Sequence, residues 1–184
     1  MQDSIFFRRE SKRSFLDKDI SEDTLSRIFE IIRWSPSCNN NQPWRFVFVT
    51  DKGQRARFIE ALPRGNRWAA AAPVLIAVCA READDYTRED DPVAYYQFDS
   101  GLATMSLLLG AVQEGLTAHA MAGYDAAKLH ESLDIPEDYH VQCVVALGHP
   151  GPIEQLDETT RKKDEAPRTR KELSEIIARD RFGF

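Results

Sequence analysis

Residues 9–15 (RESKRSF) place two arginines on either side of a serine in a segment without helical or strand periodicity. Guanidinium groups bind phosphate through paired hydrogen bonds, and a hydroxyl adds a further donor. Arg9, Ser11 and Arg13 therefore form a candidate site for a phosphorylated ligand. If this segment stood alone, a solvent-exposed basic loop would be the better explanation of the same residues.

A second chemically dense stretch lies at residues 35–44 (SPSCNNNQPW). Its hydroxyl and amide side chains lie between two prolines, which restrict the backbone, directly before a run of β-forming residues. Such a loop presents many hydrogen-bonding groups in a stiff frame. Its length and its order of residues favour a ligand-binding loop over an ordinary turn.

The patterns of several common catalytic and nucleotide sites are missing. The sequence has no GxGxxG, GxxxxGK(S/T), GxSxG or HExxH pattern, so the corresponding sites are unsupported. His140 and Cys143 share a predicted strand with no further ligand nearby, so packing explains them better than metal binding, and we predict no metal site. Asp99 could act as an acid or base, although an aspartate at the start of a helix more often caps it.

Length and composition define the class of protein. The 184 residues suffice for one domain, and 42% hydrophobic residues provide a core, which excludes disorder for most of the chain. A net charge of −6 argues against a general nucleic-acid binder, which needs a basic face. The start of the chain does not read as a signal peptide, no apolar stretch is long enough to span a bilayer, and the three cysteines are dispersed. We therefore expect a cytoplasmic protein without a membrane partner.

Hydrophobic periodicity predicts an α+β fold with a mixed, mostly antiparallel sheet flanked by helices. Asp51 begins a turn signal that ends the first strand. Strands are predicted over residues 45–50, 73–79 and 139–147. Helices are predicted from a cap at Ser21 to a stop at Pro36, over residues 54–62, from Phe98 to near Gly115, and from a cap at Asp125 through Leu133.

Two of these helices carry apolar stripes that we expect to face the core. The stripe of the first helix is Leu25, Ile28, Phe29 and Ile32, and that of the long central helix is Phe98, Leu102, Met105, Leu109 and Val112.

Two polar stretches differ from the rest of the chain. Residues 81–92 are acidic and nearly without apolar side chains, which indicates an exposed loop. Residues 154–170 show almost no apolar periodicity, so this stretch is either disordered or lies on a partner surface. A last helix is predicted over residues 171–179. Residues 154–184 together form an extended C-terminal arm.

In these features the chain resembles the FMN-dependent nitroreductase family. The family's Arg-x-Ser-x-(Arg/Lys)-x-(Phe/Tyr) motif is matched at residues 9–15, and its Pro-Ser-x-x-Asn-x-Gln-Pro-Trp loop at 36–44. Further matches follow in the family's order over nearly the whole chain. They are Ala-Pro at 72–73, Asp-x-Gly at 99–101, Gly-Leu at 115–116, a small-residue stretch ending in Gly at 121–123, Gly-(Tyr/His)-Pro at 148–150, and Arg-x-Arg at 168–170.

The resemblance implies one nitroreductase-like domain over residues 1–184 that binds FMN. Arg9, Arg168 and Arg170 would hold the FMN phosphate, and Ser11 would reach the phosphate or the ribityl chain. Arg13 would lie near the N1–C2=O edge of the flavin. A positive group there favours the negative charge that two-electron reduction leaves at N1.

Further contacts with the flavin follow from the same resemblance. Family sites lie at the interface of a homodimer, so the 36–42 loop would contact the flavin of the other subunit, and the C-terminal arm would cross that subunit. Cys38 in this loop is better explained by packing than by redox chemistry. The implied cofactor-binding residues are the loop residues Pro36, Ser37, Cys38, Asn40 and Gln42, the backbone of Glu10, Asn66 at the ring edge, and Met121, Ala122 and Gly123 near N5.

The activity implied by the resemblance is electron transfer from NADH or NADPH through FMN to a small acceptor. The acceptor would be a nitroaromatic, a quinone or an enone, reduced by a ping-pong mechanism without a protein nucleophile. Two alternatives remain open at this point. One is a flavin-binding protein without turnover, and the other is a divergent family activity such as flavin fragmentation or reductive dehalogenation.

Overall fold

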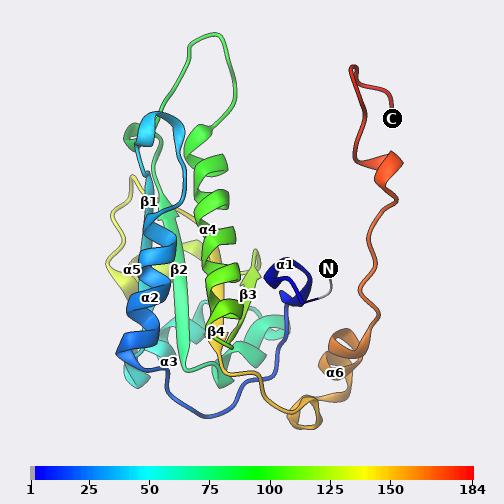
Figure 1. Cartoon of the computed structure of the whole chain (residues 1–184). Helices are drawn as coiled ribbons and strands as arrows, with labels where there is room; N and C mark the ends of the chain where they lie inside the picture. The colour runs from blue at the N-terminus through cyan, green and yellow to red at the C-terminus, as the bar shows by residue number, and fades with distance from the viewer. Residues whose placement is uncertain (1–2) are drawn as a thin grey trace.

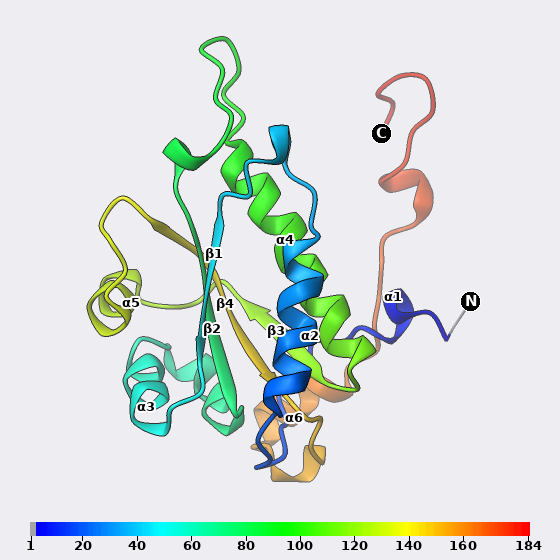
Figure 2. The same ribbon diagram turned by 60° about the vertical axis from the view of Figure 1, so that its left-hand side comes forward.

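The computed structural model describes residues 3–184 and contains a four-stranded sheet with helices on both faces (Figures 1 and 2). The strand order is β1-β2-β4-β3, and each neighbouring pair is antiparallel. The predicted α+β class is confirmed. The strands are β1 (Trp44–Val49), β2 (Val74–Ala80), β3 (Thr117–Met121) and β4 (His140–Gly148).

Most helices begin where a side chain caps the first turn. The Ser21 hydroxyl accepts a hydrogen bond from the backbone N–H of Thr24 at 3.2 Å, and Asp125 caps its helix in the same way. Asp51, expected in a turn, is instead the cap of the next helix. The helices are α1 (Ile5–Arg8), α2 (Glu22–Arg33), α3 (Lys52–Glu60), α4 (Tyr95–Gln113), α5 (Ala126–Leu133), α6 (Glu158–Glu165) and the 3₁₀ segment η2 (Arg64–Ala71).

Each face of the sheet is covered by its own helices. Alternate residues of β2 face opposite sides, as strand geometry requires. Ile76 and Val78 pack with residues of α2 and α4, whereas Leu75 and Ala77 pack with residues of α3, η2 and α5. Figure 2 shows the sheet between these two layers.

The apolar stripes are only partly buried. Phe29 in α2 is exposed, and Phe98 and Met105 in α4 are 61% and 38% exposed, so they do not belong to the core of this chain. The buried side of α4 consists largely of small residues, together with Tyr96 and Leu107. The packing is close at Gly110, where a Cβ would lie 3.1 Å from Ile31 Cδ1. Because α4 is apolar on more than one side, its periodicity could not identify the buried side.

Three segments differ from the prediction. Residues 117–121 form β3, which the sequence did not predict, and residues 154–170 contain α6. Asp157 caps α6, and the helix has an acidic first turn and a basic last turn, which stabilise it without an apolar face. The predicted helix over residues 171–179 is wrong, because only the 3₁₀ turn Leu173–Glu175 forms there.

The C-terminal arm (residues 154–184) includes α6, and beyond this helix it runs as an extended segment away from the sheet and its helices (Figure 1). Apolar side chains on this arm are largely exposed, among them Leu173, Ile177 and Phe182. No helix within residues 3–184 combines the length and hydropathy needed to cross a membrane.

Candidate functional site

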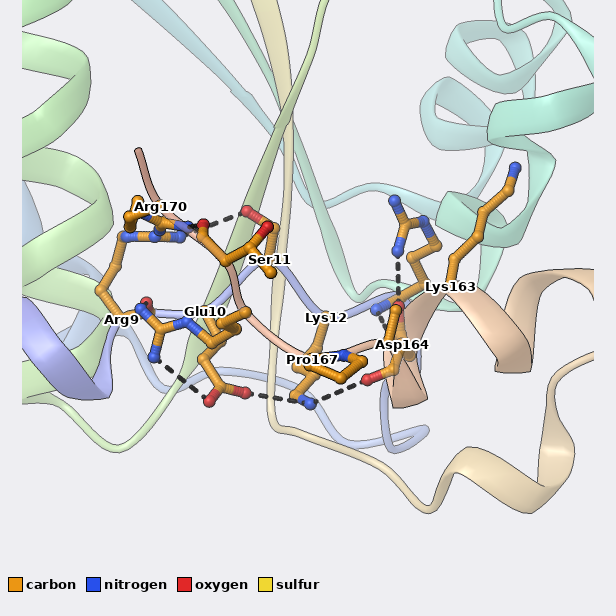
Figure 3. Close-up of a pocket in the computed structure, with 12 residues that line it drawn as sticks. Arg9, Glu10, Ser11, Lys12, Lys163, Asp164, Pro167 and Arg170 are labelled. Carbon is orange, nitrogen blue, oxygen red and sulfur yellow. Dashed lines mark hydrogen bonds and ion pairs between the residues drawn. The ribbon is translucent and has the colours of Figure 1, made fainter. Parts of the chain in front are cut away.

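A cavity of about 350 Å³ lies between the segment after α1 and the beginning of the C-terminal arm (Figure 3). Residues 9–13 form one wall, and residues 163–164 and 166–170 form the other. The lining is strongly basic although the whole chain carries a net charge of −6. Glu10 and Asp164 are its acidic side chains, and its basic side chains are Arg9, Lys12, Arg13, Lys163, Arg168 and Arg170.

The guanidinium groups of Arg9, Arg168 and Arg170 act on one another in this cavity. Burial lowers the pKa of Arg9, and the positive charges of Arg168 and Arg170 lower that pKa further, whereas Glu10 opposes the shift. The Arg9 side chain also donates a hydrogen bond to the Ser11 hydroxyl at 3.3 Å. Such a set of cations favours an anion that relieves their repulsion and accepts several hydrogen bonds.

The Glu10 side chain is already used within the protein. Lys12 Nζ lies 2.9 Å from Glu10 Oε2, and Arg168 Nη1 lies 3.4 Å from Glu10 Oε1. The hydrogen bond from Lys12 is the main reason why the pKa of Glu10 is lowered. Glu10 therefore neutralises part of the basic lining, and both of its carboxylate oxygens are already paired with Lys12 and Arg168.

Arg168 joins the arm to the N-terminal segment. Its guanidinium donates to the backbone carbonyl of Phe7 at 2.6 Å and to that of Arg9 at 3.0 Å. Arg170 differs, because its one hydrogen bond within residues 3–184 goes to the carbonyl of the preceding residue, Thr169. The remaining donors of Arg170 are available to a ligand.

The base of the site continues from Arg13 to β3. The Arg13 guanidinium lies 5.7 Å from the centre of the Trp68 ring, and that ring lies 4.6 Å from the His119 ring. His119 Nδ1 is 3.1 Å from the carbonyl oxygen of Lys12, and burial lowers the pKa of this histidine, which favours the neutral imidazole. The sequence analysis missed both aromatic residues, because no motif marks Trp68 and because β3, which carries His119, was not predicted.

Asn66 and Gly123 meet two residues from Trp68 along η2. Asn66 Nδ2 donates a hydrogen bond to the carbonyl of Gly123 at 2.8 Å. A Cβ on Gly123 would lie 2.9 Å from that same nitrogen, so a side chain would disturb the contact. Met121 is buried at the end of β3, and Ala122 and Gly123 follow it as exposed and half-buried backbone. These four candidate residues thus lie together, where η2 meets the end of β3, and none of them lines the arginine cavity.

The 36–42 loop does not reach this cavity. It lies at the other end of the molecule from α6, beside the start of α4 (Figures 1 and 2). Asn39, Asn40 and Gln42 all have positive φ angles of 50 to 57°, so the backbone is tightly folded. The Ser37 hydroxyl accepts from the Gln42 backbone at 3.0 Å, which closes the turn. Candidate residues on this loop, Pro36 included, are therefore separate from the arginine cavity within one chain.

Asp99, near the start of α4, is hydrogen-bonded to this loop. It is 2% exposed, and its Oδ2 accepts a hydrogen bond from the Cys38 backbone at 2.6 Å. Burial raises the pKa of Asp99, and the charge of Asp85 adds to this rise, whereas the hydrogen bond from Cys38 opposes it. Asp85 Oδ2 is also buried, and no hydrogen-bond partner is found for it among residues 3–184. Asp99 is the fifth residue of α4 and caps the loop, not its own helix, which corrects the sequence interpretation.

The donor set of the cavity fits a terminal phosphate. Within residues 3–184, no group of His, Cys, Asp and Glu side chains is arranged to hold a metal ion. The basic lining of the cavity favours an anionic ligand.

Comparison with known proteins identifies the family of the chain. The sequence profile of the Nitroreductase family matches residues 7–67 and 62–149. A Mycolicibacterium smegmatis protein, named as an uncharacterized 15.4 kDa protein in the ask 5′ region, is 38% identical over 122 residues, which cover 66% of this chain and 80% of that protein. A Streptomyces coelicolor protein, provisionally named as an NADH dehydrogenase/NAD(P)H nitroreductase, is 29% identical over 166 residues and covers 80% of this chain and 82% of its own.

A solved structure agrees over nearly the whole chain. It is described as an oxidoreductase containing FMN, and it superimposes with a TM-score of 0.86 at 32% identity. The match covers 97% of this chain and 91% of that protein. With the family profile spanning most of the sequence, these findings show that the chain belongs to the nitroreductase family.

Proposed function

We propose that this protein is an FMN-dependent oxidoreductase that takes electrons from NADH or NADPH and passes them to a small acceptor such as a nitroaromatic, a quinone or an enone. The observation that carries the proposal is the cavity in which Arg9, Arg168 and Arg170 meet beside Ser11. FMN ends in one phosphate, which these groups would bind. A similar solved structure is described as containing FMN, which supports this choice of ligand.

Each part of the site has a role in this proposal. The three arginines and Ser11 bind the phosphate end, and Glu10 contributes its backbone. Bound FMN supplies the hydride chemistry. Asn66 fixes the backbone at Gly123. The backbone from Met121 to Gly123 would contact the N5 side of the ring.

Arg13 would place its positive charge toward the N1–C2=O edge of the ring. That charge would favour the negative charge that the ring gains on reduction. Trp68 limits the movement of the Arg13 guanidinium because the two groups are in contact.

A homodimer completes the site. The 36–42 loop lies away from the arginine cavity of its own chain, so in this proposal Pro36, Ser37, Cys38, Asn40 and Gln42 contact the flavin of the other subunit. That subunit would cover the exposed Trp34 and Phe98 and the exposed apolar side chains of the arm, Leu173, Ile177 and Phe182. Residues 1–184 then form one domain whose arm, residues 154–184, crosses the partner; Met1 and Gln2 lie outside the described residues.

The electron donor and the compartment are proposed on separate grounds. The name of the S. coelicolor relative supports a nicotinamide donor, without deciding between NADH and NADPH. Cys38, Cys79 and Cys143 are all free thiols, which supports a reducing, cytoplasmic compartment.

The test is to reconstitute the purified protein, identify the bound cofactor, and measure turnover. Denaturation should release FMN, not FAD. Double-reciprocal plots of the initial rate against NAD(P)H concentration, taken at several quinone concentrations, should give the parallel lines of a ping-pong mechanism. The reason is that both substrates use one site in turn. Release of FAD, or no flavin binding at all, would contradict the proposal. Tight FMN binding without turnover would instead indicate a flavin-storage protein.

A further inference from the structure

The Asp164 carboxylate binds Arg13 with both of its oxygen atoms. Oδ1 accepts from Arg13 Nη1 at 2.6 Å, and Oδ2 accepts from the Arg13 backbone N–H at 2.8 Å. The Asp164 side chain is fully buried, whereas 22% of the Arg13 side chain is exposed. The two charges therefore form a short ion pair shielded from solvent on the carboxylate side.

The position of this ion pair links the C-terminal arm to the site. Asp164 is the penultimate residue of α6, and 151 positions separate it from Arg13. The Arg13 guanidinium lies between this carboxylate and the Trp68 ring, so its orientation is fixed from two sides. Both side-chain oxygens of Asp164 bind Arg13, so this carboxylate joins α6 to the segment that carries Arg13.

We infer that Asp164 is a positioning residue that holds Arg13 and, by partly neutralising it, sets the reduction potential of the bound flavin. The inference rests on the proposed function, since it concerns the flavin edge that Arg13 would face.

The electrostatic reason follows from the charge balance of reduction. Hydride transfer from NAD(P)H delivers two electrons and one proton, NAD(P)⁺ leaves, and the bound flavin gains one negative charge. Arg13 would stabilise that charge, and the Asp164 carboxylate, which binds Arg13 with both oxygens, would weaken this stabilisation by neutralising part of the Arg13 charge. In a shielded site both effects are much larger than in water. Replacing Asp164 by a neutral residue should therefore make the flavin easier to reduce.

The experiment measures the potential of FMN bound to the wild-type protein and to variants, by anaerobic equilibration with a reference dye. Asp164→Asn keeps the size and one acceptor but removes the charge. It should raise the two-electron equilibrium constant roughly ten- to a hundredfold, which corresponds to about 30–60 mV. Arg13→Gln should shift the potential in the opposite direction. The double variant should resemble Arg13→Gln, because Asp164 acts through Arg13.

Matched variants separate this effect from loss of structure. Glu158→Gln removes another carboxylate of α6, which is exposed and pairs with Lys162. This variant should leave the reduction potential of the bound FMN unchanged. Asp164→Glu keeps the charge and should restore a potential near that of the wild type. Asp164→Ser is a second neutral variant and should show the same rise as Asp164→Asn.

The outcomes distinguish the inference from the proposed function. An unchanged potential in Asp164→Asn with FMN bound would overturn the inference, and so would a rise that persists in the Arg13→Gln background. Loss of FMN from both neutral variants, with retention in Asp164→Glu, would also overturn it, since the carboxylate would then serve the architecture of the site alone. If the wild-type protein binds no FMN, the proposed function itself fails.

Discussion

Asn66 and Gly123 form a contact that leaves no space for a side chain at position 123. Asn66 Nδ2 donates to the Gly123 carbonyl at 2.8 Å, and a Cβ on Gly123 would lie 2.9 Å from that nitrogen. The hydrogen bond joins η2 to the segment that follows β3. In the proposed function, this segment lies along the N5 side of the flavin.

Gly123→Ala should therefore weaken FMN binding. The added methyl group displaces the Asn66 amide, and loss of one hydrogen bond costs about 0.5–1.5 kcal/mol, or roughly two- to tenfold in affinity. Fluorescence titration of FMN measures the change. Gly65→Ala is the matched control, because no atom lies within 4 Å of a Cβ at that position of the same region. Equal affinities for both variants would contradict the role of the Asn66–Gly123 contact.

The phosphate assignment is tested with Arg170→Ala, alone and combined with Arg168→Ala. Loss of a charge-assisted hydrogen bond costs about 1.5–3 kcal/mol, so FMN affinity should fall roughly ten- to a hundredfold. Arg170→Ala is the cleaner change, because Arg168 also holds the backbone of Phe7 and Arg9. Riboflavin, which lacks the phosphate, should bind all variants with similar affinity. An unchanged FMN affinity in the double variant would remove the arm from the phosphate site.

The raised pKa of Asp99 predicts that the stability of the protein depends on pH. The folded-state pKa of Asp99 is raised above the ordinary value of 3.8, so between these two values the folded state binds more protons than the unfolded state. The free energy of unfolding should therefore fall as the pH rises through this window, and then remain level. Asp99→Asn keeps an acceptor for the Cys38 backbone and should flatten the slope.

Denaturant unfolding from pH 4 upward, with wild type and Asp99→Asn in parallel, measures this dependence. Asp85→Asn is the companion variant, because it removes a charge that raises the pKa of Asp99. It should narrow the pH range over which the free energy of unfolding changes. Identical slopes in the wild type and in Asp99→Asn would show that another group controls the titration.

The dimer is tested by mixing two damaged chains. Arg170→Ala weakens the phosphate cavity, and Asn40→Ala removes an amide from the loop proposed to serve the other subunit. Each homodimer should then bind FMN weakly, whereas a mixed dimer regains one site built from the intact cavity and the intact loop. Equilibrium dialysis of FMN after mixing measures the recovery. A monomeric mass by light scattering at full flavin occupancy would contradict the shared site.

The sequence predicted those elements whose signals are local. The cap at Ser21 and the apolar run of β2 were sufficient for α2 and β2. Strand β3 (TAHAM) is short and has little β-propensity, and it forms because Thr117–Met121 pairs with β4. Phe98 and Met105 of α4 were expected in the core but are exposed. The sequence could not identify the buried side, because a helix with several apolar sides has no unique periodicity.

For the site, the motifs identified its arginines but not its internal contacts. Trp68, His119 and Asp164 lie in no motif that the sequence analysis used. Asp164 meets Arg13 across 151 positions of the chain, a separation over which no spacing rule applies. Such contacts depend on the final packing, and the structure was required to find them.

The most direct test of the central claim is anaerobic reduction of the FMN-loaded protein. NADH or NADPH should bleach the flavin absorbance completely, and subsequent addition of a quinone or nitroaromatic without oxygen should restore it. Arg170→Ala, loaded at saturating FMN, should behave in the same way, because the phosphate contact serves binding. A bound flavin that neither nucleotide reduces, or a reduced flavin that no such acceptor reoxidises, would contradict the assignment as an NAD(P)H-dependent oxidoreductase.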